Sequence, residues 1–299
     1  MKIPKGGIAF FDSGIGGLTV LATCRQYLPN EIFYYYGDNQ HAPYGNLPPK
    51  KIKRFVERAF AVFARLKVRA VVIACNTATM LCIDELRKRY TFPIIGTEPA
   101  VVPAVKGGGE VFVLTTRATF ESNRFKQLCK RAQEKYPHAN LTAIACDGLA
   151  GEIEKHLGEK DADFTPFLPR GQPDVVVLGC THYIYIKEAI EKFYGCLVIC
   201  GNEGVALRLC SVIQKEGIKT TFSLKREKNR ETQPRLTTPP KKRGNIRQKG
   251  QKIPFTEEKK GEIFFLGKCQ VVNKTQCEQM FAHNNHENGV SSGQKKQKN

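Results

Sequence analysis

Short apolar runs alternate with amphipathic stretches along most of the chain. Four runs, at 8–11, 71–74, 111–114 and 175–178, are rich in Val, Ile, Leu or Phe and are bounded by polar residues. Such runs are typical of strands buried in a parallel sheet. The stretch 49–66 instead repeats apolar residues at helical spacing, with basic residues between them, which predicts a helix packed on a sheet. This alternation of strands and helices indicates an α/β fold.

The strand pattern occurs twice with the same kind of polar ending. Cys75 and Cys180 each close an apolar run and are followed by small polar side chains, in Cys-Asn-Thr and Cys-Thr-His. In parallel sheets such endings lie at the carboxyl edge, where α/β proteins bind ligands. The sequence therefore predicts two similar doubly wound parallel-sheet domains, with the active site in the cleft between the domains and one cysteine from each.

The composition changes after Thr220, and this change sets the expected domain bounds. Beyond it, Lys, Arg, Gln, Asn and Pro dominate and apolar residues are rare, a composition typical of disorder. One later apolar run, at 263–267, predicts a strand. The expected segments are a first domain over 1–97, completed by part of 207–270, a second domain over 98–206, a disordered basic linker over 221–260 and a disordered polar tail over 282–299.

The formal charge of +19 suggests a polyanion partner until its distribution is considered. From Lys219 onward the chain has 19 Lys and Arg against 7 Asp and Glu, so most of the excess lies in the tail. The tail sequence has little aromatic content and no recognisable RNA- or DNA-binding motif. We expect at most weak, salt-sensitive contact between nucleic acid and this basic tail.

The sequence indicates neither a membrane segment nor a secretion signal. No apolar run approaches the ~20 residues of a transmembrane helix, and residues 1–7 lack the apolar core of a signal peptide. We therefore expect a cytoplasmic protein. The eleven cysteines show neither a disulfide pattern nor the spacing of a zinc site, which predicts reduced thiols and no bound metal.

The glycine-rich turn after the first apolar run differs from two common nucleotide-binding motifs. Gly14, Gly16 and Gly17 do not form G-x-G-x-x-G, because residue 19 is Thr, and no Lys-Ser/Thr pair follows as in a P-loop. The glycines instead predict a turn in which the backbone approaches a small ligand and offers its amides to a carboxylate.

Two cysteines that converge from two domains suit proton transfer at a carbon atom from opposite faces. One thiolate removes a proton, and the thiol across the cleft delivers another and inverts the centre. A free thiol, with a pKa near ~8.5, needs assistance at neutral pH. Asp12 follows a strand of the first half and is expected near Cys75, whereas His182 is the expected partner of Cys180.

The motifs that carry these residues resemble those of the glutamate racemases, within the aspartate/glutamate racemase family. They are, in order, Asp12-Ser-Gly-Ile-Gly-Gly, Tyr36-Gly-Asp38, Pro43-Tyr-Gly45, Ala74-Cys-Asn-Thr-Ala78, Glu98-Pro99 and Gly179-Cys-Thr-His-Tyr183. The resemblance covers about residues 6–215. It implies an isomerase that interconverts L- and D-glutamate without a cofactor and supplies D-glutamate for peptidoglycan synthesis. It is compatible with a homodimer.

The same resemblance implies a role for each site residue. Cys75 would handle the α-proton of D-glutamate and Cys180 that of L-glutamate, assisted by Asp12 and His182. A further carboxylate of the family corresponds to Glu154, which could equally belong to a solvated helix face. From the motifs and the hydroxyl and amide side chains in and near them, the expected substrate contacts are Asp12, Ser13, Tyr44, Gly45, Asn76, Thr77, Thr116, Thr181 and His182.

Three other functions fit part of the pattern. A racemase for a related amino acid, such as aspartate, would use the same two thiols. A cysteine hydrolase needs one cysteine with a base and an oxyanion hole, which leaves the second cysteine motif unexplained. An inactive binding protein with a nucleic-acid-contacting tail is disfavoured by the intact Cys75, Cys180, Asp12 and His182. Glu98, which precedes a proline, is expected to be structural.

Overall fold

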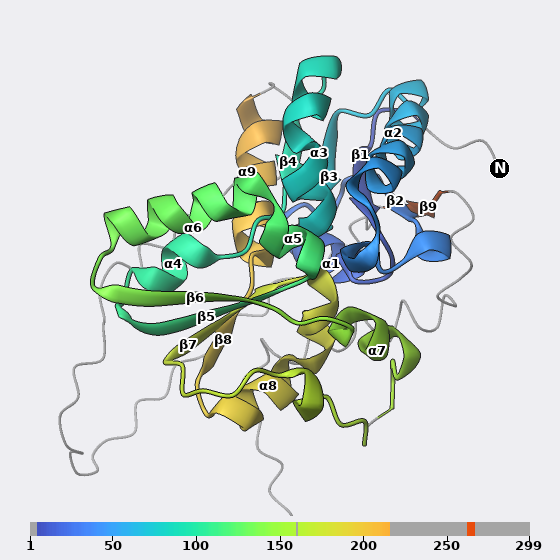
Figure 1. The fold of residues 1–299 in the computed structure, drawn as a ribbon. Coiled ribbons are helices and arrows are strands. Elements are labelled where there is room, and N and C mark those ends of the chain that lie inside the picture. The colour runs from blue at the N-terminus through green and yellow to red at the C-terminus, as the bar shows by residue number, and fades with distance from the viewer. Residues whose placement is uncertain (1–4, 160, 216–261, 267–299) are drawn as a thin grey trace, which may run out of the picture.

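Two parallel β-sheets, each with helices on both faces, make up the part of the chain that the structure describes (Figure 1). This computed structural model describes residues 5–159, 161–215 and 262–266. The expected fold class, two α/β domains with parallel sheets, is confirmed. The expected basic linker over 221–260 and polar tail over 282–299 lie outside the described residues. Within those described ranges, no helix combines the length and apolar character needed to cross a membrane.

The first sheet has the strand order β4–β3–β1–β2–β9, and every neighbouring pair is parallel. Its strands are β1 (Ile8–Asp12), β2 (Phe33–Gly37), β3 (Ala70–Ile73), β4 (Ile94–Gly96) and β9 (Ile263–Phe265). The late apolar run therefore does form a strand, and it completes the sheet beside β2. Because β1 is central, the turn that follows it leaves the middle of the carboxyl edge.

Helices cover the first sheet on both faces. The associated elements are α1 (Gly17–Tyr27), α2 (Pro49–Arg65), α3 (Asn76–Arg89) and α9 (Asn202–Lys215), with short turns η1 (Asn39–His41) and η2 (Tyr44–Asn46). One core joins Phe10 of β1 to Leu21 of α1 and Leu209 of α9. The other places Phe60 of α2 and residues of α3 against the opposite face. Alternate side chains of β1 thus pack into two separate cores, one on each face of the sheet.

The second sheet has the order β6–β5–β7–β8 and is also parallel. Its strands are β5 (Gly109–Thr115), β6 (Ala139–Ala145), β7 (Val175–Gly179) and β8 (Leu197–Ile199). Two cores again lie on its two faces. The surrounding elements are α4 (Val101–Val105), α5 (Arg117–Glu121), α6 (Asn123–Lys135), α7 (Leu149–Lys155), α8 (Lys187–Tyr194), η3 (Thr165–Phe167) and η4 (Thr181–Ile186).

Local hydrogen bonds move several helix boundaries away from those expected from periodicity. The pattern predicts a helix from Thr79, yet α3 begins at Asn76 because the Cys75 sulfur accepts the Ala78 amide and caps it. Helical periodicity over 120–136 likewise predicts one helix, but the structure has two, α5 and α6. The break lies at Ser122, whose extended backbone ends α5 and whose hydroxyl caps α6 through the Phe125 amide. Side-chain caps of this kind are poorly visible to hydrophobic periodicity.

Phe10 provides a test of the first core. Its side chain is fully buried between β1, α1 and α9, so we expect Phe10→Ala to lower the free energy of unfolding by about 3–5 kcal/mol. Urea denaturation followed by circular dichroism measures this change. Leu197→Ala is the control, because Leu197 is 60% exposed and its loss should cost no more than about 0.5 kcal/mol. Equal losses for both variants would contradict the core described here.

Candidate active site

Both cysteines lie at the carboxyl ends of parallel strands. Cys75 follows β3 and caps α3, with 3.5 Å between its sulfur and the Ala78 nitrogen. Cys180 follows β7 directly and precedes η4. The two residues are 4% and 8% exposed, and both line the same cavity. Each sheet therefore contributes one thiol to a single buried site.

The cavity between the thiols is narrow. Its volume is about 10 Å³, which suffices for roughly one water molecule. An amino acid can therefore enter only if the walls of the cavity move apart. The lining residues are Ser13, Pro43, Tyr44, Gly45, Cys75, Asn76, Thr77, Thr116, Ala150, Cys180, Thr181 and His182.

Burial keeps the Cys75 thiol protonated at neutral pH. Its S–H group donates to the Ser13 hydroxyl, with 3.5 Å between sulfur and oxygen. Burial, together with the negative charge of Asp12, raises the pKa of Cys75 to about 12, although the Ala78 amide and Ser13 oppose this shift. A positive charge near the sulfur, such as a ligand ammonium group, would favour the thiolate.

Cys180 has a basic side chain beside it. The His182 Nδ1 atom lies 3.7 Å from the Cys180 sulfur, and the His182 Nε2 atom lies 2.7 Å from Glu154 Oε1. Burial acts to lower the pKa of His182, but Cys180, Glu154 and Asp12 outweigh it and raise that pKa well above its usual range. The imidazolium form, with one N–H directed at sulfur and one at a carboxylate, is therefore favoured.

Asp12 connects the two halves of the site. One carboxylate oxygen accepts the Gly14 amide at 3.0 Å, and the other accepts the Thr181 hydroxyl from the second domain at 3.3 Å. Burial raises the pKa of Asp12, whereas the charge on His182 opposes the increase. A side chain at Gly16 would overlap Thr181, so glycine at this position permits the contact.

The Tyr44 loop forms another wall of the cavity. The Tyr44 hydroxyl donates to Asp38 at 2.6 Å, and the other oxygen of Asp38 lies 2.8 Å from His41 Nδ1. Burial, followed by the hydrogen bond to Asp38, raises the pKa of Tyr44, so its hydroxyl is neutral. The adjacent Gly45 packs directly against the Thr116 side chain of the second domain.

Three threonine hydroxyls join the domains at the start of α3. Thr77 Oγ1 lies 2.9 Å from Thr116 Oγ1 and 3.3 Å from Thr119 Oγ1. Beside them, the Asn76 side-chain amide donates to the Thr97 carbonyl at 3.2 Å. A substrate carboxylate could replace some of these hydroxyl–hydroxyl contacts, because hydroxyl groups donate readily to charged acceptors.

The structure brings every predicted site residue to this region, in two ways. Most of them line the cavity directly, whereas Asp12 and Glu154 reach it through Thr181 and His182. Two lining residues, Pro43 and Ala150, were not predicted as substrate contacts. Pro43 belongs to a motif quoted above, but Ala150 carries no polar group that could have signalled a site. Across the described residues, no cluster of three or more His, Cys, Asp or Glu side chains could hold a metal ion.

Comparisons with known proteins agree with this geometry. Residues 19–208 match the profile of the Asp/Glu/Hydantoin racemase family. A glutamate racemase from Clostridium perfringens is 37% identical over 233 residues, which are 73% of this chain and 87% of that protein. The solved glutamate racemase from Bacillus anthracis is 30% identical, with a TM-score of 0.61, and the alignment covers 71% of this chain and 83% of that one.

A second solved relative is the glutamate racemase from Escherichia coli, determined in complex with L-glutamate and the activator UDP-MurNAc-Ala. It is 28% identical with a TM-score of 0.63, over 71% of this chain and 83% of that one. The family profile spans more than half of the chain, and the alignment with the clostridial enzyme extends over most of both proteins. The chain therefore belongs to the Asp/Glu/Hydantoin racemase family.

Proposed function

We propose that this protein is a glutamate racemase that interconverts L- and D-glutamate by two-base proton transfer and supplies D-glutamate for peptidoglycan synthesis. The observation that carries the proposal is the convergence of Cys75 and Cys180 on one cavity from two different sheets. Each thiol also has its own assisting group within the site. The relatives named above support glutamate as the substrate, since one of them was determined with L-glutamate bound.

In the proposed reaction, one cysteine acts on each face of the α-carbon. With D-glutamate, the Cys75 thiolate removes the α-proton, and the Cys180 thiol then delivers its proton to the opposite face to form L-glutamate. The reverse reaction exchanges these roles, so the sulfur that receives a proton in one direction donates it in the other. Proton transfer by positioned groups of this kind typically contributes 10²–10⁴-fold to a rate.

Asp12 and His182 assist the two thiols in this proposal. The His182 imidazolium donates from Nδ1 to the Cys180 thiolate, while Glu154 orients the ring through Nε2. On the other side, the Asp12 carboxylate attracts the substrate ammonium group, whose positive charge favours the Cys75 thiolate. The raised pKa of Cys75 therefore restrains its ionisation until substrate is bound.

The polar wall of the cavity supplies the proposed substrate contacts. Hydroxyl and amide donors suit the two carboxylates of glutamate, and the Tyr44–Gly45 backbone closes the cavity beside them. The proposed contacts are Asp12, Ser13, Tyr44, Gly45, Asn76, Thr77, Thr116, Thr181 and His182.

Replacement of either cysteine tests the two-base reaction. We expect Cys75→Ala and Cys180→Ala each to lower kcat for racemisation by at least about 10²-fold in both directions, measured by circular dichroism of the amino acid. Cys82→Ala is the control, because Cys82 is a buried thiol of α3 outside the cavity. Near-normal turnover by either site variant, in protein that remains folded, would contradict the two-base mechanism.

Isotope exchange tests the reaction and its substrate. With D-glutamate in D₂O and a chelator present, we expect loss of the optical signal together with one deuterium at the α-carbon of the L product, measured by mass spectrometry. Racemisation without deuterium uptake contradicts proton exchange at this carbon. Turnover of aspartate but not glutamate would place the protein with aspartate racemases instead.

The pH dependence tests the role of Glu154. Its carboxylate helps to raise the pKa of His182, so Glu154→Gln should lower that pKa and cause the imidazolium to deprotonate at lower pH. We expect the alkaline limb of kcat/KM to move down by roughly one pH unit. Glu152→Gln is the matched control, because Glu152 is on the same helix but pairs with Lys155 and His156. An unmoved limb in Glu154→Gln would contradict this role.

A further inference from the structure

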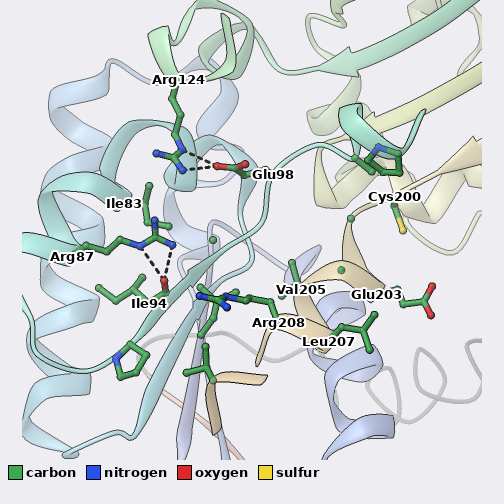
Figure 2. A pocket seen from close by; sticks show the side chains of 18 of the residues that line it. Ile83, Arg87, Ile94, Glu98, Arg124, Cys200, Glu203, Val205, Leu207 and Arg208 are labelled. Atoms are coloured by element: carbon green, nitrogen blue, oxygen red, sulfur yellow. Dashed lines mark hydrogen bonds and ion pairs between the residues drawn. The ribbon is translucent and has the colours of Figure 1, made fainter. Parts of the chain in front are cut away.

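A large open crevice lies where the chain passes between the two domains. Its volume is about 1010 Å³, and both connections between the sheets line it. The first contributes Gly96, Glu98 and Ala100 from the end of β4 onward, and the second contributes Ile199, Cys200 and Gly201 from the end of β8 onward. Figure 2 shows Arg124 and Glu98 facing each other in this crevice. Neither Cys75 nor Cys180 lines it, so its side chains cannot act on the substrate directly.

Arg124 contacts both domains and the connection between them. Its guanidinium donates to Glu98 Oε1, from Nε at 2.8 Å and from Nη2 at 2.6 Å. The same group donates from Nη1 to both oxygens of Asp84, at 2.8 and 3.0 Å. Arg124 belongs to α6 of the second domain and Asp84 to α3 of the first, while Glu98 lies on the link after β4. One side chain therefore links three parts of the fold.

The same helix that carries Asp84 also begins at the active site. Cys75 caps α3, and Thr77 in its first turn contacts Thr116 of the second domain at 2.9 Å. Asp84 lies about 10 Å farther along this rigid helix, at about 1.5 Å per residue. The first and second domains thus meet along α3 at two points, one beside the thiols and one at Arg124.

We propose that Arg124 is a positioning residue that favours the closed arrangement of the two domains and so holds the two cysteines opposite each other. This inference rests on the proposed racemase function. Because the cavity holds roughly one water molecule, the domains must separate to admit substrate and then close again. Arg124 is 25% exposed at its side chain, and it shares its charge between two carboxylates, which makes its contacts stronger than those of an isolated surface pair.

The neighbouring arginines have different roles. Arg87 donates to the Ile94 carbonyl at 2.9 and 3.1 Å and stays within the first domain. Arg89, on the same helix as Asp84, pairs with Glu57 of α2 at 3.3 Å, also within the first domain. Arg124 differs from both in joining the two domains. The Arg89–Glu57 pair is exposed and lies far along the same helix, so it provides a matched control.

Steady-state kinetics test the inference. We expect Arg124→Gln to lower kcat for glutamate by about 3- to 10-fold in both directions without raising KM, because the enzyme–substrate complex then spends less time in the closed arrangement that holds the two cysteines opposite each other. Asp84→Asn should have a similar but smaller effect. The double variant should fall short of the product of the two single effects, since both remove the same contact. Arg89→Gln should leave kcat within about twofold.

Thiol labelling measures the same opening without relying on turnover. A short maleimide pulse followed by mass spectrometry of the Cys75 and Cys180 peptides should show several-fold faster modification in Arg124→Gln than in wild type or Arg89→Gln. Cys24 is 0% exposed in the core between α1 and α9, so its labelling reports global unfolding and should not change.

Two results would overturn the role of Arg124. One is unchanged kcat and unchanged labelling of Cys75 and Cys180 in both Arg124→Gln and Asp84→Asn. The other is an equal effect of Arg89→Gln. These results are distinct from failure of the proposed function, which would appear as a wild-type protein that does not racemise glutamate. In that case the labelling experiment still decides whether Arg124 restrains the opening of the domains.

Discussion

The close approach of the turn after β1 to the segment after β7 is the constraint on which the site depends. Asp12 accepts the Thr181 hydroxyl at 3.3 Å, and the adjacent backbone can come this near only because Gly16 has no side chain to overlap Thr181. β1 is central in its sheet and β7 is internal in the other. The contact therefore joins the middles of two carboxyl edges. Cys75 follows β3, which pairs with β1, and Cys180 follows β7 itself, so both cysteines lie beside this contact.

Closing these edges against each other removes water from ionisable groups. Burial raises the pKa values of Asp12 and Cys75, whereas in His182 the neighbouring thiol and carboxylate overcome the effect of burial and raise the pKa. The two thiols thus lie in unlike surroundings, one facing a hydroxyl and a carboxylate and the other an imidazolium. A buried charge is costly unless it is paired, so the ammonium group of a bound amino acid would stabilise the Asp12 carboxylate.

Contacts between the domains also occur along α3, at some distance from the thiols. The threonine cluster at its first turn and the Arg124 ion pairs near its middle lie on one rigid helix. Glu98, on the connection after β4, also takes part in these contacts. The sequence predicted a structural role for this residue. The structure shows its contact with Arg124, and this contact gives that expectation a physical basis: the carboxylate holds the chain segment after β4 against α6.

The sequence by itself determined the strands and the placement of both cysteines. Apolar runs bounded by polar residues form β3 and β7, and a residue just after a parallel strand must lie at the carboxyl edge. Only the tertiary structure decided which polar groups meet, because Asp12 and Thr181 are 169 residues apart and Glu154 and His182 are 28 apart. Periodicity records which face of an element is buried. It carries no information on how two domains dock, and hydrogen bonds of about 3 Å depend on that docking.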